Sequence, residues 1–192
     1  MAPKIKVTKK DIIETALTLI RRSGASAINA RSIASALGCS TQPVFSNFKS
    51  MEELEEAALA AAYEIYLEFI IAEVENGKYP PYKAFGMAYI RFAKEEKELF
   101  KLLFMCDREG GEQKPTADFT ASVEMIMGAN GVTREKAELM HLEMWTSVHG
   151  IGTMLATSFL SLEWDLISDM LTDVYQGICA RHLTGEKQNG RN

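Results

Sequence analysis

The chain has 192 residues, of which 47% are hydrophobic and 24% are charged, and its net charge at pH 7 is −5. This composition is typical of a folded soluble protein with one or two domains, and no run approaches the ~20 apolar residues of a membrane span. Residues 1–10 lack an apolar signal core, so the expected location is the cytoplasm. The three cysteines lie far apart without metal-ligand spacing, which favours reduced, buried thiols over disulfides or zinc.

The charge is distributed unevenly along the chain. Residues 1–50 contain eight Lys and Arg residues but only two acidic residues, which gives a net charge of +6. The remaining residues, 13 basic and 24 acidic, have a net charge of −11. A basic segment followed by an acidic one suggests that the first part meets a polyanion, although an ordinary solvated surface would have the same composition.

Helix-forming residues dominate, and no segment keeps the two-residue alternation of a strand. The first predicted helix begins after Thr8, which forms a capping box with Asp11, and it stops near Gly24. A short second helix is predicted over residues 30–37, with Asn29 as its N-cap.

A third helix is predicted directly after the second, because Gly38 can supply the positive φ of a tight turn. With Ser40 as its N-cap, Pro43 would be the third helical residue, in the turn where a missing N–H removes no helical hydrogen bond. The predicted apolar face of this helix consists of Val44, Phe45 and Phe48. Off that face lie Thr41, Gln42, Ser46 and Asn47.

A second capping box at residues 50–53 begins a long predicted helix that ends near Asn76-Gly77. Further helices are predicted at 82–94, 96–106, 116–128, 133–160 and 163–183. Residues 107–115 are predicted to form a surface loop, and the tail after residue 183 is expected to fray. The expected fold is all-α with about nine helices.

The second and third predicted helices fit a helix-turn-helix over about residues 29–48, to which the first helix adds a third. The third helix can then enter a DNA major groove. These three helices also resemble the TetR family signature, over about residues 6–66. The residues that carry the resemblance are Arg31-Ser32-Ile33-Ala34-Ser35-Ala36-Leu37-Gly38-Cys39-Ser40, Val44-Phe45-Ser46-Asn47-Phe48 and Glu53-Leu54. The resemblance implies a homodimeric transcriptional regulator, usually a repressor, that a small ligand releases from DNA.

Carried over by position, the resemblance implies that the recognition helix spans residues 40–47. Gln42 is suited to an adenine edge, Thr41 to a phosphate or a base, and Pro43 to a thymine methyl group. The implied DNA-binding residues are Arg31, Ser40, Thr41, Gln42, Pro43, Phe45, Ser46, Asn47 and Lys49.

Two positions within residues 6–66 depart from the family pattern. Many members have tyrosine where this chain has Phe45 and lysine where it has Met51, and both usual residues contact phosphates. Because phosphate contacts supply much of the affinity, weaker DNA binding is expected unless lysines near the N-terminus compensate. These lysines are Lys4, Lys6, Lys9 and Lys10.

The acidic part resembles one C-terminal subtype of the same family, over about residues 80–180. The resemblance rests on residues 89–95, Leu99-Phe100, Phe104 and residues 144–150, where Trp145, His149 and Gly150 match the subtype's tryptophan-histidine-glycine signature. It implies that residues 67–185 form a ligand-binding and dimerisation domain. The subtype commonly has proline where this chain has Lys97, so the turn there is expected to differ.

Methionines and aromatic residues gather where the family binds its small-molecule effector, which suits a largely apolar molecule. The same residues would also fill an ordinary core, and His149 could be a core histidine stacked on Trp145 rather than a ligand contact. The candidate effector residues are Phe85, Tyr89, Phe92, Phe104, Met105, Met144, Trp145 and His149. His141 and His149 have no carboxylate in step, so no metal site is expected. No cofactor is predicted either.

The last two long helices carry more apolar residues than a peripheral helix needs, which predicts a homodimer through them. The sequence contains no nucleophile elbow, glycine-rich phosphate loop or paired metal ligands, so no enzyme is predicted. The leading interpretation is a ligand-responsive repressor that binds a palindromic double-stranded DNA operator. The alternative is a helical module that binds small molecules or proteins without binding DNA.

Overall fold

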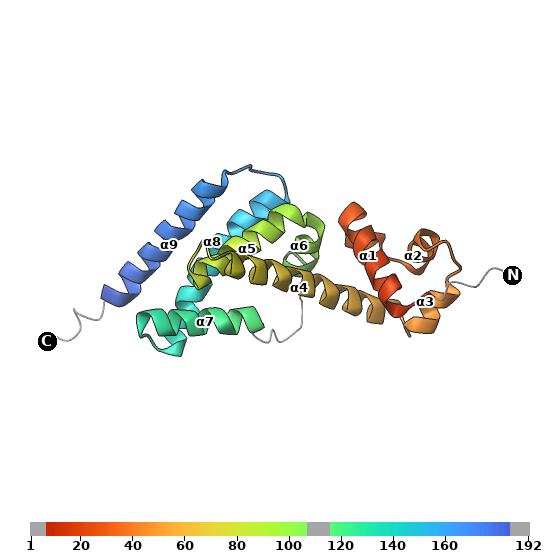
Figure 1. Cartoon of the computed structure of the whole chain (residues 1–192), viewed down its shortest axis with the longest axis horizontal. Coiled ribbons are helices and arrows are strands. Elements are labelled where there is room, and N and C mark those ends of the chain that lie inside the picture. Colours follow the sequence, from red (N-terminus) through yellow and green to blue (C-terminus); the bar gives the residue numbers. More distant parts are fainter. Residues whose placement is uncertain (1–6, 107–115, 185–192) are drawn as a thin grey trace. The chain divides into compact units, whose positions relative to one another are not determined.

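A computed structural model describes residues 7–106 and 116–184 of the chain. Within these residues there are nine α-helices, one turn of 3-10 helix and no strand (Figure 1). The prediction of an all-α fold is therefore confirmed. Lys4, Lys6, the predicted loop at 107–115 and the tail after 184 lie outside the described residues. None of the described helices is long and apolar enough to span a membrane.

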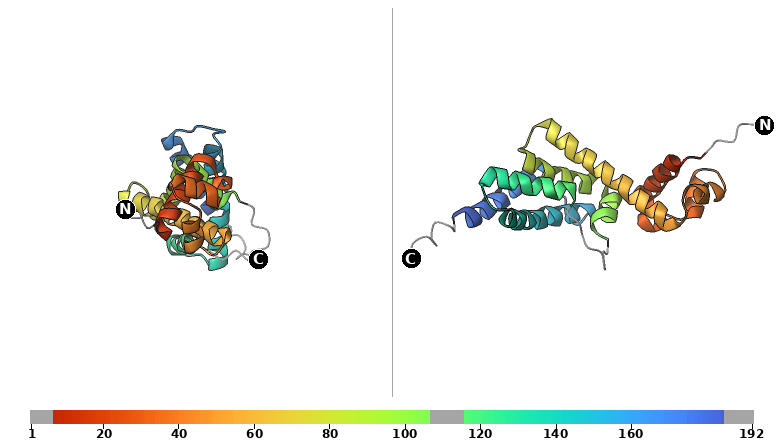
Figure 2. Two further views of the ribbon diagram at one scale, coloured as in Figure 1. Left: turned by 90° about the vertical axis from the view of Figure 1, so that its right-hand side faces the viewer. Right: turned by 90° about the horizontal axis from the view of Figure 1, so that it is seen from below.

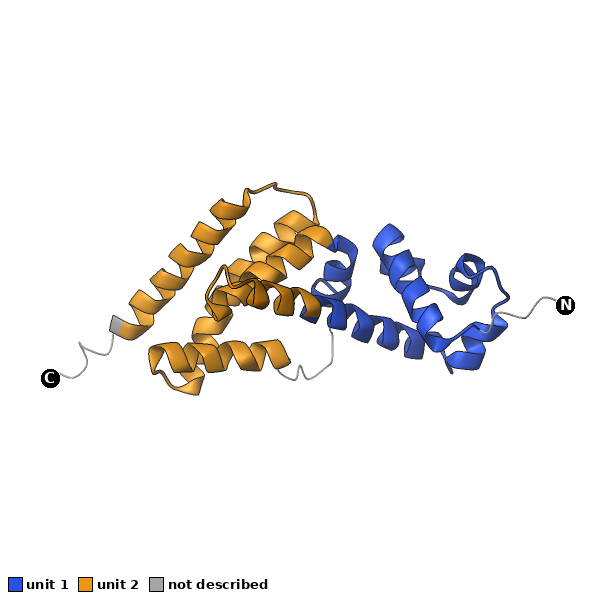
Figure 3. Cartoon of the chain, viewed as in Figure 1, with its two compact units in different colours: residues 1–67, 96–107 blue, residues 68–95, 108–192 orange. Residues whose placement is uncertain are grey.

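The helices form two compact units (Figure 3). Unit 1 comprises residues 1–67 and 96–107, and unit 2 comprises residues 68–95 and 108–192. One long helix, α4 (Met51–Asn76), contributes residues to both units. The other helices of unit 1 are α1 (Lys9–Ser23), α2 (Ala30–Ala36), α3 (Gln42–Asn47) and α6 (Lys97–Phe104).

The helix ends of unit 1 follow local sequence signals. The Asp11 backbone N–H donates to the Thr8 hydroxyl at 3.2 Å, and the Thr8 N–H donates to the Asp11 carboxylate at 2.8 Å, which completes the predicted capping box. At the other end of α1, Gly24 has a φ of 79°, so the predicted stop is confirmed. Asn29 caps α2 through the backbone N–H groups of Arg31 and Ser32, as predicted.

The core of unit 1 joins α1, α2 and α3, each of which contacts the other two. Ile12 and Ile20 of α1 and Ile33 of α2 are fully buried. Val44 of α3 is 1% exposed, and Phe48 directly after α3 is 2% exposed. These two anchors fix which face of α3 points inward.

The start of α3 differs from the prediction. Thr41, not Ser40, is at the N-cap position, and Pro43 is the second helical residue instead of the third. An N-cap serine accepts a hydrogen bond mainly from the N–H two or three residues later. If Ser40 were the cap, the residue three positions later would be Pro43. Because proline has no N–H, Ser40 would lose one of its usual hydrogen-bond donors.

Unit 2 is built around α8 (Arg134–Ala156), which contacts α5 (Pro81–Glu95), α7 (Ala117–Asn130) and α9 (Trp164–Thr184). Figure 2 shows α5, α7 and α8 lying side by side. A Cβ atom added to Gly86 would lie 3.4 Å from side-chain atoms of both Leu171 and Val148, so this part of α5 packs against α8 and α9.

α8 ends four residues earlier than predicted, at Ala156. Ser158 has a φ of 58°, in the left-handed region, and the backbone N–H of Phe159 donates to the Met154 carbonyl at 2.9 Å. This bond closes the end of the helix in the manner of a C-terminal capping motif. Glycine usually occupies the left-handed position, so a serine there does not predict a helix end.

The last two helices carry both buried and exposed apolar residues. Those buried within unit 2 include Ile151, Leu155, Ile167, Leu171 and Ile178, although the sequence predicted a dimer through these two helices. Those exposed on α8, on α9 and on the segment between them are Leu139, Leu142, Trp145, Met154, Phe159, Leu160, Leu166, Met170 and Leu183. We call the second set the apolar hairpin surface.

Candidate functional site

The outer face of α3 carries Gln42, Phe45 and Ser46, all of which are exposed. The Phe45 side chain is 55% exposed, although the sequence placed it with Val44 and Phe48 on the apolar face. That assignment is wrong because residues 45 and 44 are 100° apart on a helix, and only Val44 points toward α1 and α2. The outer face of α3 therefore combines one amide, one hydroxyl and one phenyl ring.

Two polar side chains of α3 make bonds within unit 1. The Ser46 hydroxyl donates to the Gln42 carbonyl at 2.8 Å. The Asn47 side-chain amide donates to the Pro43 carbonyl at 2.8 Å and to the Val7 carbonyl at 3.5 Å. Asn47 is half-buried, so its amide helps to fix α3.

The other predicted DNA-binding residues lie close to α3 in the sequence. Arg31 is exposed in the first turn of α2, and its side chain forms no ion pair with another described residue. Ser40 is exposed and Thr41 is half-buried at the turn before α3. Lys49 is exposed between α3 and α4.

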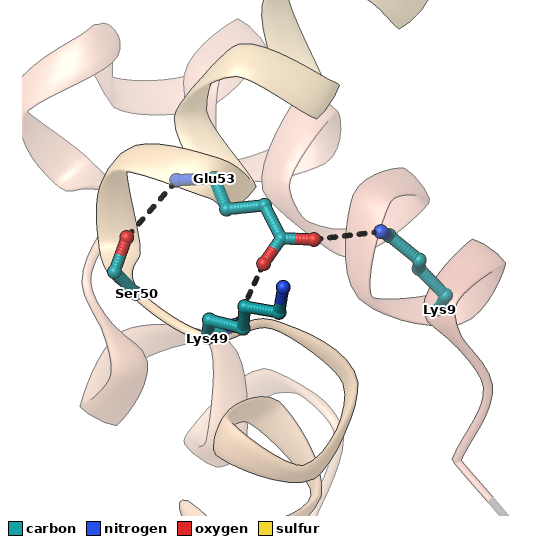
Figure 4. A network of polar contacts seen from close by, with 4 residues as sticks. All are labelled: Lys9, Lys49, Ser50 and Glu53. Atoms are coloured by element: carbon teal, nitrogen blue, oxygen red, sulfur yellow. Dashed lines mark hydrogen bonds and ion pairs between the residues drawn. The ribbon is translucent and has the colours of Figure 1, made fainter.

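A carboxylate joins three segments of unit 1 at the start of α4 (Figure 4). Glu53 accepts one hydrogen bond from the Lys49 backbone N–H at 2.8 Å and another from the Lys9 ammonium group at 3.1 Å. The Glu53 N–H in turn donates to the Ser50 hydroxyl at 3.3 Å. The bonds from Lys49 and Lys9 hold the pKa of the Glu53 carboxyl below its usual range.

This arrangement changes the role expected for Lys9. Its ammonium group pairs with Glu53 and lies 4.6 Å from the centre of the Phe48 ring. Lys9 therefore links α1 to the α3–α4 junction through an exposed ion pair and a cation–π contact.

Unit 1 also contains an ion pair between α1 and the residue before α6. The Arg21 guanidinium donates to both carboxylate oxygens of Glu96, at 2.8 and 2.9 Å. The paired geometry is the strong, bidentate form, and the hydrogen bond to Glu96 raises the pKa of Arg21. It fixes α6 against α1 within unit 1.

In unit 2, three of the predicted effector residues lie together. The Tyr89 hydroxyl and His149 Nδ1 are 2.8 Å apart, and the His149 ring stacks on Trp145 with ring centres 4.9 Å apart. Burial lowers the pKa of His149. Trp145 is 38% exposed, so the stack reaches the protein surface.

The remaining effector candidates are distributed over both units. Phe92 and Met144 are buried in unit 2, and Phe85 is half-buried there. Phe104 and Met105 belong to unit 1, where Phe104 packs edge-on against Tyr66 with ring centres 5.3 Å apart.

A second tyrosine–histidine pair, which the sequence did not reveal, joins the same two helices. The Tyr82 hydroxyl and His141 Nδ1 are 3.0 Å apart, and the Phe119 ring meets His141 edge-on at 4.9 Å. Tyr175 also packs against Tyr82, with ring centres 5.4 Å apart. Burial lowers the pKa of His141 and raises that of Tyr82. The only sequence signal was spacing, since both tyrosines and both histidines recur after about two helical turns.

An open hollow of ≈ 660 Å³ lies at the turn between α7 and α8, beside the end of α9. It is lined by Asn130, Gly131, Val132, Thr133, Glu135, Lys136, Leu139, His182 and Leu183. None of the predicted effector residues is among them. His182 at its edge lies 3.0 Å from the Glu143 carboxylate.

Comparison with known families gives one match, over residues 82–175, to the model described as "Tetracyclin repressor-like, C-terminal domain". The match supports the TetR family. No curated protein shows a significant match to the chain. The TetR-like region begins at Tyr82 and ends at Tyr175, so it includes both tyrosine–histidine pairs and lies largely within unit 2. The predicted helix-turn-helix, at about residues 29–48, lies before the matched residues.

The three cysteines are free thiols. However, none is buried, because Cys39 and Cys179 are half-buried and Cys106 is exposed.

Proposed function

We propose that the chain is a ligand-responsive transcriptional regulator that binds DNA through α3, most simply as a repressor. The observation that carries the proposal is the two-sided construction of α3. Val44 and Phe48 hold one side in the core, while Gln42, Phe45 and Ser46 project outward from a basic segment. Its position before a TetR-like C-terminal domain supports the same function.

In this proposal residues 6–66 are the DNA-binding domain. Gln42 reads a base edge, since its amide can both donate to and accept from an adenine in the major groove. Arg31 and Lys49 contact phosphates, which position the protein without specifying sequence. Ser40, Thr41, Pro43, Ser46 and Asn47 complete the surface that faces the groove.

Residues 67–185 form the proposed dimerisation and effector-binding domain. The residues of the apolar hairpin surface are exposed in the single chain, and, apart from Trp145, a second copy would cover them. A two-fold symmetric dimer carries two reading heads, so its operator is palindromic with half-sites about one helical turn or a multiple apart. The tryptophan-histidine-glycine subtype stays a prediction.

The proposed effector is a small, largely apolar molecule in contact with the aromatic residues predicted from the sequence. The stack of Trp145 on His149, held by the Tyr89 hydroxyl, offers it an aromatic surface with one polar group. The effector releases DNA only if it binds more tightly to a dimer whose heads do not fit the operator.

DNA binding and the role of Gln42 are tested together. A preferred operator is first selected from random duplexes, and its affinity is then measured by fluorescence anisotropy at several salt concentrations. Gln42→Ala is expected to weaken operator binding by ~1–3 kcal/mol and to relax the base preference at one position of each half-site. The matched control is Gln176→Ala, an exposed glutamine on α9, which should bind like the wild type.

Two outcomes would contradict the proposal in different ways. If Gln42→Ala leaves affinity and base preference unchanged, α3 is not the recognition helix. If the wild type shows no site-specific, salt-sensitive binding to any duplex, the chain is instead a module that binds small molecules or proteins without DNA.

A further inference from the structure

Phe45 is the most exposed large apolar side chain that the structure describes in unit 1. It lies on α3 three residues after Gln42 and one before Ser46, so the three side chains share one side of the helix. No other described residue makes an aromatic or cation contact with its ring. An exposed phenyl ring at the centre of a polar surface gains free energy when a partner covers it.

The chemistry of the ring limits what that partner can be. A phenyl group has no hydrogen-bond donor or acceptor, so it cannot bind a phosphate oxygen or a polar base edge as the Gln42 amide can. In the major groove the base edges carry donors and acceptors on every pair, and the C5-methyl group of thymine is the apolar group exposed there.

We infer that Phe45 reads a thymine methyl group in each operator half-site. The inference rests on the proposed function, because it requires α3 to lie in the major groove, and it adds the identity of a second base to be recognised. Gln42 and Phe45 are three residues apart, or about 4.5 Å along the helix axis. Since successive base pairs are about 3.4 Å apart, the thymine lies within about two base pairs of the base that Gln42 reads.

Replacing thymine with deoxyuridine removes only the methyl group and leaves base pairing intact, which makes it a direct test. In the selected operator, each thymine is replaced one position at a time, symmetrically in both half-sites. Burial of one methyl group corresponds to about a fourfold change in affinity per half-site. We therefore expect one position at which the wild type loses affinity by about 4-fold to 16-fold.

The protein variants assign that loss to Phe45. Phe45→Ala should bind the thymine operator more weakly than the wild type and should no longer distinguish thymine from deoxyuridine at that position. Phe45→Leu keeps an apolar side chain and should keep part of the discrimination. Leu59→Ala removes another exposed apolar side chain of unit 1, on α4, and should change nothing. Because Phe45 lies outside the core, circular dichroism should show all three variants folded.

A second, independent test changes the base itself at the same position. Replacing the thymine with cytosine should weaken binding by the wild type, and 5-methylcytosine should restore part of the affinity because it returns the methyl group. Phe45→Ala should bind both cytosine operators equally.

The outcomes separate this inference from the proposed function. If the wild type binds its operator specifically but no deoxyuridine position loses its effect in Phe45→Ala, the ring contacts sugar or another protein and the inference is wrong. DNA recognition by α3 would then still stand. If no duplex is bound specifically, both the proposed function and the inference fail.

Discussion

His141 is the most buried of the three histidines, with 9% of its surface exposed. Its Nδ1 atom lies 3.0 Å from the Tyr82 hydroxyl, and Phe119 covers one side of its ring. When the imidazole is neutral, Nδ1 can accept the hydrogen bond from Tyr82 while Nε2 carries the proton. A protonated ring would carry a hydrogen on Nδ1 and donate to the Tyr82 oxygen instead, but it would place a positive charge in buried surroundings. The surroundings therefore favour the neutral histidine.

This preference predicts a pH-dependent stability. Because burial lowers the pKa of His141 in the folded chain, the unfolded chain takes up a proton first as the pH falls below about 6.5. The melting temperature should therefore decrease as the pH is lowered from 7.5 to 5.5. His149, whose pKa is lowered for the same reason, adds to the decrease.

The contribution of His141 can be isolated by substitution and thermal melting followed by circular dichroism. His141→Asn keeps an acceptor near the position of Nδ1 but cannot titrate, so it should melt lower at pH 7.5 and lose less stability at pH 5.5 than the wild type. Tyr82→Phe removes only the hydroxyl and leaves His141 to titrate, so its pH dependence should remain. Equal pH dependence in His141→Asn and the wild type would rule out this role.

At the residue scale, the sequence predicted features that depend on near neighbours. The box formed by Thr8 and Asp11 depends on residues three apart and was predicted correctly. The bond between Tyr82 and His141 joins residues 59 positions apart, and no local pattern contains that information. Phe45 was misplaced because α3 is only six residues long, which is too short for apolar spacing to identify the buried face.

At the scale of elements, the end of α8 depends on one left-handed residue. Ser158 has a φ of 58°, a conformation that glycine adopts without strain and that costs other residues about 1–2 kcal/mol. The cost is greatest for residues branched at Cβ. The predicted helix to residue 160 missed this stop because serine gives no signal for it.

Valine and glycine at position 158 should therefore change the free energy of unfolding by different amounts. Ser158→Val should lower the free energy of unfolding by about 1–2 kcal/mol, because valine adopts a positive φ at a higher cost than serine. Ser158→Gly should change it by less than about 1 kcal/mol, because relief of strain offsets the greater freedom of glycine in the unfolded chain. Urea denaturation of both variants measures the difference, and a Val variant as stable as the Gly variant would show that the conformation is not required.

At the scale of the whole molecule, the sequence predicted the number of helices but not how they are grouped. Residues 96–107 join unit 1, although 28 residues of unit 2 separate them from the rest of it. The pair between Arg21 and Glu96 spans 75 positions and depends on this return of the chain. Charge and periodicity could not predict it, because both describe residues that are near in sequence.

Dimerisation is the property of the whole molecule on which the proposed function most depends. In the proposed function each DNA-binding domain contacts one half-site, and joining two domains would raise the effective concentration of the second by orders of magnitude. The buried residues of α8 and α9 pack against other residues of the same chain. The apolar hairpin surface is exposed, so it is available to a partner. Leu142 on α8 and Met170 on α9 are exposed members of it.

Charges on the apolar hairpin surface should therefore separate the dimer. Sedimentation of the wild type should give twice the 21.4 kDa mass of the chain. The double variant Leu142→Asp/Met170→Asp should sediment as a folded monomer, because burying two carboxylates in an apolar interface is costly. The matched control, Leu59→Asp/Ile71→Asp, adds the same charges to exposed apolar positions of α4 and should remain dimeric.

The monomeric variant should also bind the full operator at least 100-fold more weakly, with single half-site affinity unchanged. A double variant that remains dimeric would place the interface elsewhere, and a monomer with full operator affinity would show that the two heads act independently.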